Sequence, residues 1–232
     1  MNPTLFALSQ LPLRLVNAVL DLRVGGRRRG VFFDIDRTFP ALREVDRNYA
    51  AIRQELMAIL PGWRELPAYH ELDAAQTRIS ASTAGRWNVF LLYAVGEKPE
   101  ANRARCPQTC AVLDRIPGLF QAFFSILEGG KSIPEHCGPY RGYLRYHLPL
   151  LVPVRNPPSI RVHDVRHTWQ EGRSVLFDDS WDHEVYNEAD DIRAVLIVDV
   201  LRPLPPLLDA LNRLVSVFIR YLYGRGLVKN LR

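Results

Sequence analysis

The first third of the chain carries apolar residues at helical spacing. Residues 4–22 show this period with an interruption at Pro12, and residues 41–60 show it again along one stripe. Both stretches predict amphipathic helices. The polar residues 65–85 have no such period, so we expect mostly loop there.

The pattern changes further along the chain to short apolar runs separated by turn residues, which is typical of a β-sandwich or barrel. We also expect strands at residues 32–35 and 88–93, and helices at 107–116 and 207–223. The later strands are expected at residues 122–127, 144–152, 160–162, 174–177, 184–187 and 192–200. The chain is therefore predicted to be mainly β with flanking helices.

Three segments follow from this change of pattern. We expect residues 1–86 to form helices and loops that pack on the core, residues 87–206 to form the β domain, and residues 207–232 to form a basic C-terminal helix. A chain of 232 residues is long enough to bury one substantial core.

Membrane insertion and export are not expected. The most apolar stretch, residues 4–22, contains Arg14 and Asp21, and it lacks the basic leader and cleavage site of a secretory signal. The three cysteines, Cys106, Cys110 and Cys137, cannot all pair within one chain. We therefore expect a reduced, cytoplasmic protein.

Positive charge is concentrated at the two ends of the chain. Residues 1–29 hold five arginines against Asp21, and residues 207–232 hold five basic residues against Asp209, so the ends carry +8 and the middle −3 of the net +5. Basic apolar helices can bind the surface of an anionic membrane. The alternative, which we favour at this point, is that both helices pack on the domain with their charges in water. The basic run at residues 27–29 is too short to predict nucleic-acid binding.

Two histidines stand in segments that together suggest one iron site. His136 follows the sequence Ser-Ile-Pro-Glu, His183 follows Asp-Asp-Ser-Trp-Asp, and Arg193 comes ten residues after the second histidine. This arrangement is typical of a non-haem Fe(II) oxygenase that uses 2-oxoglutarate and O2. Such enzymes usually add a carboxylate two residues after the first histidine, but here that position is Gly138.

These segments resemble the aspartyl/asparaginyl β-hydroxylase family between Trp87 and Pro203. The resemblance implies a double-stranded β-helix (a cupin-like jelly roll), which agrees with the strand pattern, and iron held by two histidines with glycine in the place of the carboxylate. The matching segments are Trp87, residues 106–110, 124–125, 136–139, 144–148, 169–172, 177–180, 183–185 and 193–199.

The resemblance also implies where 2-oxoglutarate binds. Ser125 and Arg193 would hold its distal carboxylate, while Arg145 and His147 would lie near its 1-carboxylate and keto end. Residues two apart on a strand share a face, so Arg145 and His147 point the same way. An arginine inside a barrel needs an anion to offset its burial, and the cosubstrate could supply that anion.

Asp178 or Asp179 could order a water molecule beside the metal, and the sequence does not decide between them. We also expect that an acid introduced by Gly138→Asp would be accommodated at the metal. His70, His163 and His167 have no comparable context and are not expected to be ligands.

The predicted activity is hydroxylation of an unactivated C–H bond, with 2-oxoglutarate converted to succinate and CO2. Our first choice of substrate is the β-carbon of aspartyl or asparaginyl residues or a related amino acid, with Arg86, Arg103 and Arg141 as candidate contacts for its carboxylate. An alternative is a lipid acyl-chain hydroxylase that contacts the membrane through the basic terminal helices. A second alternative is a non-catalytic jelly-roll binding module.

Overall fold

The computed structural model describes residues 11–229. The parts of the predicted terminal helices that fall at residues 4–10 and 230–232 lie outside this range. None of the helices within residues 11–229 is long and apolar enough to cross a membrane.

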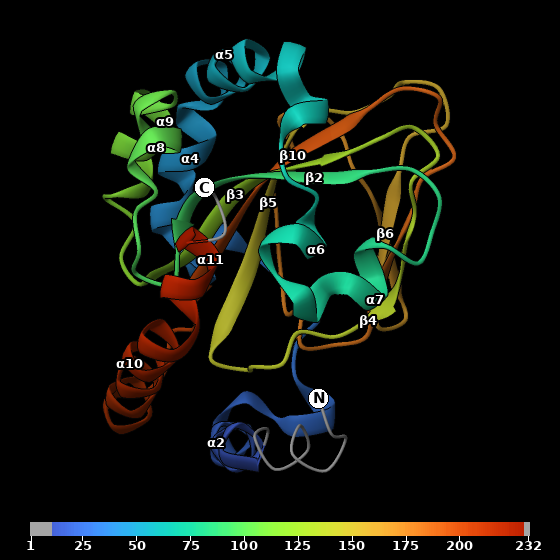
Figure 1. Cartoon of the computed structure of the whole chain (residues 1–232). Helices are drawn as coiled ribbons and strands as arrows, with labels where there is room; N and C mark the ends of the chain where they lie inside the picture. Colours follow the sequence, from blue (N-terminus) through green and yellow to red (C-terminus); the bar gives the residue numbers. More distant parts are fainter. Residues whose placement is uncertain (1–10, 230–232) are drawn as a thin grey trace.

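Two antiparallel sheets form the centre of the molecule (Figure 1). The larger sheet has the strand order β1-β8-β5-β10-β3-β2 and the smaller one β4-β9-β6-β7. The strands are β1 Phe32–Phe33, β2 Trp87–Ala94, β3 Leu119–Leu127, β4 Ile133–His136, β5 Tyr143–Leu151, β6 Ser159–Val162, β7 Val165–Thr168, β8 Val175–Phe177, β9 His183–Tyr186 and β10 Arg193–Leu201.

The order of these strands is that of a double-stranded β-helix. From β3 to β10 the chain moves back and forth between the two sheets, and β1 and β2 extend the edges of the larger sheet. Apolar residues of both sheets, such as Phe123 and Val195 from one and Ile160 and Val185 from the other, share one buried core. The predicted fold class is therefore confirmed.

Each strand predicted from the apolar runs is present within a few residues of its expected ends, but β4 and β7 were missed. Strand β4 contains Pro134, which weakens a strand signal, and β7 is largely exposed, so it lacks a run of apolar residues. Strand β1 pairs with β8, so the segment before residue 87 supplies an edge strand of the larger sheet. The division of the chain into three segments stays a prediction.

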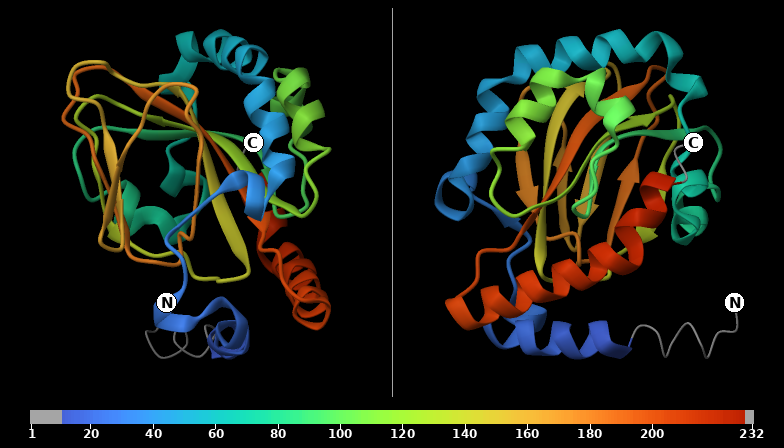
Figure 2. Two further views of the ribbon diagram at one scale, coloured as in Figure 1. Left: turned by 180° about the vertical axis from the view of Figure 1, so that it is seen from behind. Right: turned by 60° about the vertical axis from the view of Figure 1, so that its left-hand side comes forward.

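Helices cover the outer face of the larger sheet and one end of the molecule (Figure 2). Helices α4, α5 and α9 pack on the outer face, and α2 and α10 lie at the end (Figures 1 and 2). The helices are α2 Leu11–Val24, α3 Ile35–Thr38, α4 Arg43–Arg47, α5 Tyr49–Ile59, α6 Tyr69–Leu72, α7 Thr77–Ser80, α8 Glu100–Ala104, α9 Pro107–Leu113, α10 Pro206–Ile219 and α11 Arg225–Lys229, with a π-helical turn at Arg220–Gly224.

The helix predicted over residues 41–60 is broken at Asn48. Its side-chain amide donates to the backbone carbonyl of Glu44 over 2.8 Å, taking the acceptor that a continuous helix would need. Pro12 lies in α2 beside residues 1–10, which the structure does not describe, so the interruption expected at Pro12 stays a prediction.

The expectation of mostly loop over residues 65–85 was wrong. Short helices form there because polar side chains satisfy their ends: Glu71 accepts from the backbone N–H of Ala68, and Asp73 accepts from that of Ala75. The buried Lys131 donates to the carbonyls of Ser80 and Thr83. These local hydrogen bonds leave no periodic apolar signal in the sequence.

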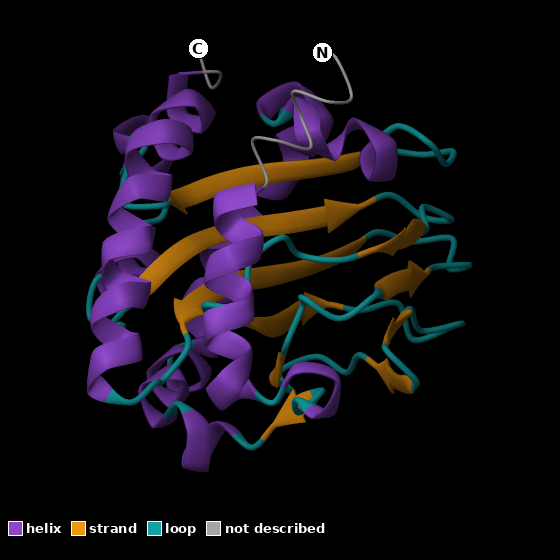
Figure 3. Ribbon diagram, turned by 90° about the horizontal axis from the view of Figure 1, so that it is seen from below, coloured by secondary structure: helices purple, strands orange, loops and turns teal. Residues whose placement is uncertain are grey.

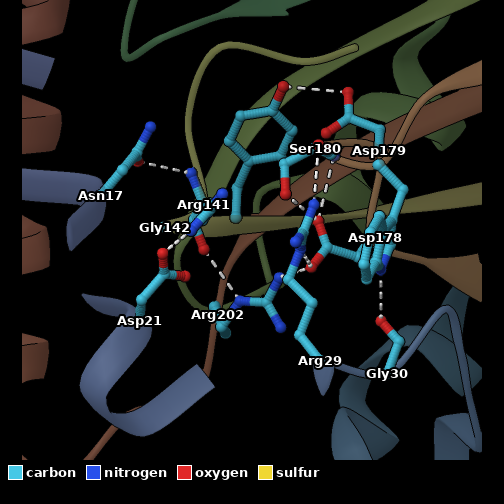
Figure 4. A network of polar contacts seen from close by, with 12 residues as sticks. Asn17, Asp21, Arg29, Gly30, Arg141, Gly142, Asp178, Asp179, Ser180 and Arg202 are labelled. Carbon is cyan, nitrogen blue, oxygen red and sulfur yellow. Dashed lines mark hydrogen bonds and ion pairs between the residues drawn. The ribbon is translucent and has the colours of Figure 1, made fainter. Parts of the chain in front are cut away.

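Asp178 joins three distant parts of the chain (Figure 4). Its Oδ2 accepts from Arg202 Nη2 at 2.6 Å and lies 3.2 Å from Arg29 Nε, while its Oδ1 accepts from the backbone N–H and hydroxyl of Ser180. The Arg29 guanidinium also lies 3.6 Å from the ring centre of Trp181. Because Asp178 and both arginines are buried, each charge depends on the others.

We predict that Asp178→Ala lowers the free energy of unfolding by about 3–5 kcal/mol, since it leaves two buried guanidinium groups without their carboxylate. Urea denaturation followed by circular dichroism measures this loss. In the control Asp209→Ala, which removes a largely solvated pair with Arg213, the loss should be about 1 kcal/mol or less. Equal losses in the two variants would contradict the structural role of Asp178.

Candidate metal and cosubstrate site

The two predicted ligands lie side by side. His136 on β4 stands opposite His183 on β9 in the smaller sheet, and their ring centres are 4.1 Å apart. Nδ1 of His136 lies 2.8 Å from the carbonyl of Pro134, and Nδ1 of His183 lies 2.9 Å from that of Trp181. Each ring therefore donates through Nδ1 and keeps the lone pair of Nε2 for a ligand bond.

Both imidazoles are in the protonation state that a metal requires. Burial lowers the pKa of His136 to about 3, with a further contribution from His183, and burial lowers the pKa of His183 to about 4. Both rings are thus neutral at neutral pH. Within residues 11–229 there is no cluster of three or more histidine, cysteine, aspartate or glutamate side chains that could hold a metal, so the protein offers these two nitrogens. The donor set fits the predicted two-histidine centre.

Asp179 occupies the space beside Gly138. A Cβ atom at Gly138 would lie 2.5 Å from Asp179 Oδ1, and the backbone N–H of Gly138 donates to the Asp179 carbonyl over 2.7 Å. The expectation that Gly138→Asp would be accommodated was therefore wrong. Asp179 Oδ2 accepts from the Tyr143 hydroxyl at 2.9 Å and lies 3.1 Å from Arg145 Nη1. Its buried Oδ1 has no hydrogen-bond partner among residues 11–229.

Arg193 is a buried cation without a carboxylate. It is 1% exposed, its Nη1 donates to Ser125 Oγ over 3.3 Å, and its guanidinium lies 3.9 Å from the ring centre of Trp169. Trp87 Nε1 donates to the same Ser125 hydroxyl over 3.0 Å. No ion pair to Arg193 occurs within the described part of the chain, and desolvation lowers its pKa to about 9. Burial of this charge is explained if an anionic ligand binds here.

His147 lies between the two ends of the site. It is 4% exposed, and neither ring nitrogen has a hydrogen-bond partner in the part of the chain that the structure describes. The ring centre of His147 is 4.9 Å from that of Phe177 and 5.8 Å from that of Trp169. The Phe177 ring centre is in turn 6.2 Å from that of His183. Burial, followed by the charges of nearby arginines, holds its pKa well below the usual value. Buried polar atoms normally have partners, so these two nitrogens fit contact with a polar ligand.

Arg145 shares this side of the sheet with His147 but has protein partners. Its Nε and Nη2 donate to the two carboxylate oxygens of Asp199 over 2.7 and 2.8 Å, and its Nη1 faces Asp179. The inference that Arg145 needs a cosubstrate to offset its burial was therefore wrong, because Asp199 and Asp179 supply the negative charge. Its contact with 2-oxoglutarate stays a prediction.

Three site features were not assigned from the sequence. Trp87 and Trp169 were recognised only as matching positions, although they support Ser125 and Arg193, and Asp199 received no role. The two tryptophans could have been assigned from the sequence, because both are positions of the family motif. The pairing of Arg145 with Asp199 had no signal in the sequence, because it depends on the register between β5 and β10.

Two of the three arginines proposed to receive a substrate carboxylate are already paired. Arg103 binds Asp114 at 2.7 Å, and Arg141 pairs with Asp21. Arg86 instead lines a cavity of about 280 Å³ next to Trp87.

Comparison with known proteins places the chain in a family. The family model for aspartyl/asparaginyl beta-hydroxylase matches residues 46–203. The chain is 45% identical over 168 residues to the ornithine lipid ester-linked acyl 2-hydroxylase of Rhizobium tropici, covering 72% of this chain and 59% of that protein. It is 30% identical over 167 residues to human aspartyl/asparaginyl beta-hydroxylase, covering 70% of this chain and 21% of that one.

Among solved structures, a Pseudomonas putida prolyl-4-hydroxylase aligns with a TM-score of 0.43 at 15% identity, covering 67% of this chain and 88% of that one. The family match spans more than half of the sequence and includes both histidines, Ser125 and Arg193. The chain belongs to the aspartyl/asparaginyl beta-hydroxylase family.

Proposed function

We propose that this protein is an Fe(II)- and 2-oxoglutarate-dependent hydroxylase. The observation that carries the proposal is the buried Arg193, which has Ser125 beside it but no carboxylate partner within residues 11–229, on the same interior as a pair of neutral histidines. A dicarboxylate spanning the site would give Arg193 its anion and His147 its hydrogen-bond partner. Iron with this cosubstrate and O2 supplies the oxidising power for C–H hydroxylation, with release of succinate and CO2.

In this proposal, the residues of the site bind either the iron or one end of the cosubstrate. Nε2 of His136 and Nε2 of His183 hold the iron, while Arg193 and Ser125 hold the distal carboxylate. His147 contacts the opposite end of the cosubstrate.

Asp179, which lies beside Gly138, supplies the carboxylate that many related oxygenases carry at the position of Gly138. Its free Oδ1 can accept a hydrogen bond from a water molecule beside the imidazoles. Tyr143 and Arg145 fix this carboxylate through Oδ2, so its position does not depend on the ligand. Asp178 is committed to Arg29 and Arg202, which leaves Asp179 for this role.

For the substrate, we propose the acyl chain of a membrane lipid. The support is the 45% identity to a lipid acyl 2-hydroxylase, against 30% to the human aspartyl/asparaginyl enzyme, and the existing ion pairs of Arg103 and Arg141. An aspartyl or asparaginyl substrate, our first choice from the sequence, remains the second candidate, supported by the family match and by Arg86 beside its cavity. Turnover-coupled succinate release with lipid extracts, peptides and free amino acids compares the two.

We predict that His136→Ala and His183→Ala each reduce succinate release by more than about 100-fold, because one imidazole cannot hold the iron. The far-ultraviolet circular dichroism spectrum should be unchanged. His163→Ala is the control, since that ring stacks on Trp181 and has no place in the pair. Turnover that survives in either ligand variant would rule out the assignment.

We predict that Arg193→Ala weakens 2-oxoglutarate binding to the manganese-loaded protein by about 10- to 100-fold, the value of a buried charged hydrogen bond. Isothermal titration calorimetry measures the dissociation constant, and Arg103→Ala, which removes a pair with Asp114, should leave it unchanged. If the wild-type protein binds manganese but no 2-oxoglutarate, the non-catalytic binding module takes the place of the hydroxylase.

We predict that Gly138→Ala reduces turnover at least tenfold and destabilises the protein by about 1–3 kcal/mol, because its Cβ must displace a carboxylate that Tyr143 and Arg145 hold in place. Gly226→Ala is the matched control, because no atom lies within 4 Å of its added Cβ. Kinetic assays and urea denaturation of both variants provide the measurement. Unchanged turnover in Gly138→Ala would show that the position of Asp179 is unimportant.

A further inference from the structure

Exposed large apolar side chains gather on two helices. Of the twelve found in the described part of the chain, eight belong to α2 or to α10 and the π-helical turn that continues it, with exposed fractions from 41% to 88%. These are Leu15, Val19 and Leu22 on α2, and Leu207, Leu214, Val217, Phe218 and Tyr221 on α10 and its continuation. Together they are called the outer stripes.

Each of these helices is apolar on two faces. On α2, Leu15, Val19 and Leu22 follow one another at the spacing of a single helix face, while Leu20 is fully buried on another. On α10, Leu208 and Val215 pack inward, and the outer residues point away from them. Large apolar side chains that lie together on a surface normally mark a contact with a partner or a membrane, and nothing within residues 11–229 covers the outer stripes.

The two helices lie at the same end of the molecule, as Figures 2 and 3 show. Inward-facing residues of both helices pack against one apolar cluster that includes Tyr140 and Tyr143. The outer stripes therefore belong to one end of the protein rather than to opposite sides.

This end is joined to the metal site through one turn. Asn17 on α2 donates to the carbonyl of Pro139 over 2.9 Å and accepts from the backbone N–H of Arg141 over 3.0 Å. Asn212 on α10 donates to the carbonyl of Gly142 over 2.7 Å. The turn held between the two helices begins three residues after His136, so both helices are fixed relative to the iron ligands.

Arginines border the outer stripes. Arg14 precedes Leu15 and Arg23 follows Leu22, so these two arginines lie on opposite borders of the α2 stripe, and both are exposed. Arg27 and Arg28 follow in the next turn and are also exposed. An arginine can lay its apolar stem on a membrane surface while its charge meets the headgroups.

We propose that the outer stripes and their arginines dock the protein on an anionic lipid bilayer, and that the hydroxylated acyl chain is drawn from that bilayer. The substrate part rests on the proposed function; the docking part stands on the helices alone. A second copy of the chain fits less well, because a two-fold contact would bring the basic borders of the two copies together. An anionic headgroup layer matches both the apolar stripes and the positive charge.

The test is co-sedimentation of the full chain with vesicles. We expect binding to vesicles of phosphatidylcholine and phosphatidylglycerol in equal parts, weaker binding to phosphatidylcholine alone, and a decrease with added salt. Leu15→Gln/Leu22→Gln and Leu214→Gln/Phe218→Gln should each lower the partition coefficient at least about tenfold. Arg14→Gln/Arg23→Gln should reduce binding to the anionic vesicles only.

Met57→Gln/Val154→Gln is the matched control, because it removes two exposed apolar side chains from outside the two helices. Binding that is equal in the stripe variants and in this control would overturn the proposal. The proposal would also be overturned if light scattering shows a wild-type dimer that becomes a monomer in the stripe variants, and if the wild-type protein does not bind vesicles. Binding of the stripes to a peptide substrate in place of vesicles would overturn it as well.

Failure of docking can be told apart from failure of the proposed function. The stripe variants should bind manganese and 2-oxoglutarate as tightly as wild type, since none of the replaced side chains lies in the site. Their succinate release should fall at least tenfold with lipid in vesicles and recover with the same lipid dispersed in detergent. Vesicle binding without any 2-oxoglutarate binding would rule out the proposed hydroxylase function but would still support membrane docking by the outer stripes. Release that stays low in detergent would show that the stripes do not act through the bilayer.

Discussion

The burial of positive charge inside a β-barrel is the constraint on which the rest of this structure depends. A guanidinium group removed from water needs a negative partner, or its burial costs several kcal/mol. Arg145 has Asp199 and Asp179, and Arg202 has Asp178. Arg193 is as deeply buried as these and has none among residues 11–229. Among the buried arginines of residues 11–229, Arg193 alone has no carboxylate partner, and this difference supports the proposed cosubstrate site.

Two consecutive aspartates connect stability with chemistry. Asp178 lies directly after β8 and meets Arg29 and Arg202, while Asp179, in the turn that follows, faces Gly138 and Tyr143. Asp178 holds the segment after α2, through Arg29, and the segment after β10, through Arg202, against the turn before β9. Asp179 places a carboxylate beside the histidine pair. One local geometry thus supports the fold and shapes the site, which favours a rigid metal centre.

The terminal helices α2 and α10 have a fixed position relative to the candidate site. Through Asn17 and Asn212, α2 and α10 hold the turn that follows β4, and His136 ends that strand. A surface bound by the outer stripes would therefore lie at a fixed place relative to the histidine pair. This arrangement suits a substrate that is confined to a plane, because a lipid chain can only approach from the membrane. Family membership alone does not choose between lipid and protein substrates; the exposed faces of these helices provide the physical reason to prefer lipid.

Local pattern was enough to predict most strands and the longer flanking helices and to single out both histidines, because alternation, turn residues and motif spacing depend on neighbouring positions. Contacts between distant strands could not be predicted in this way. Arg145 and Asp199 are 54 residues apart, and only the register of β5 against β10 brings them together. The same holds for the different partners of Asp178 and Asp179 and for the lack of an ion pair at Arg193 among residues 11–229. Sequence determined which chemical groups are available; tertiary structure decided which charges neutralise one another, since that depends on distances that only the folded chain defines.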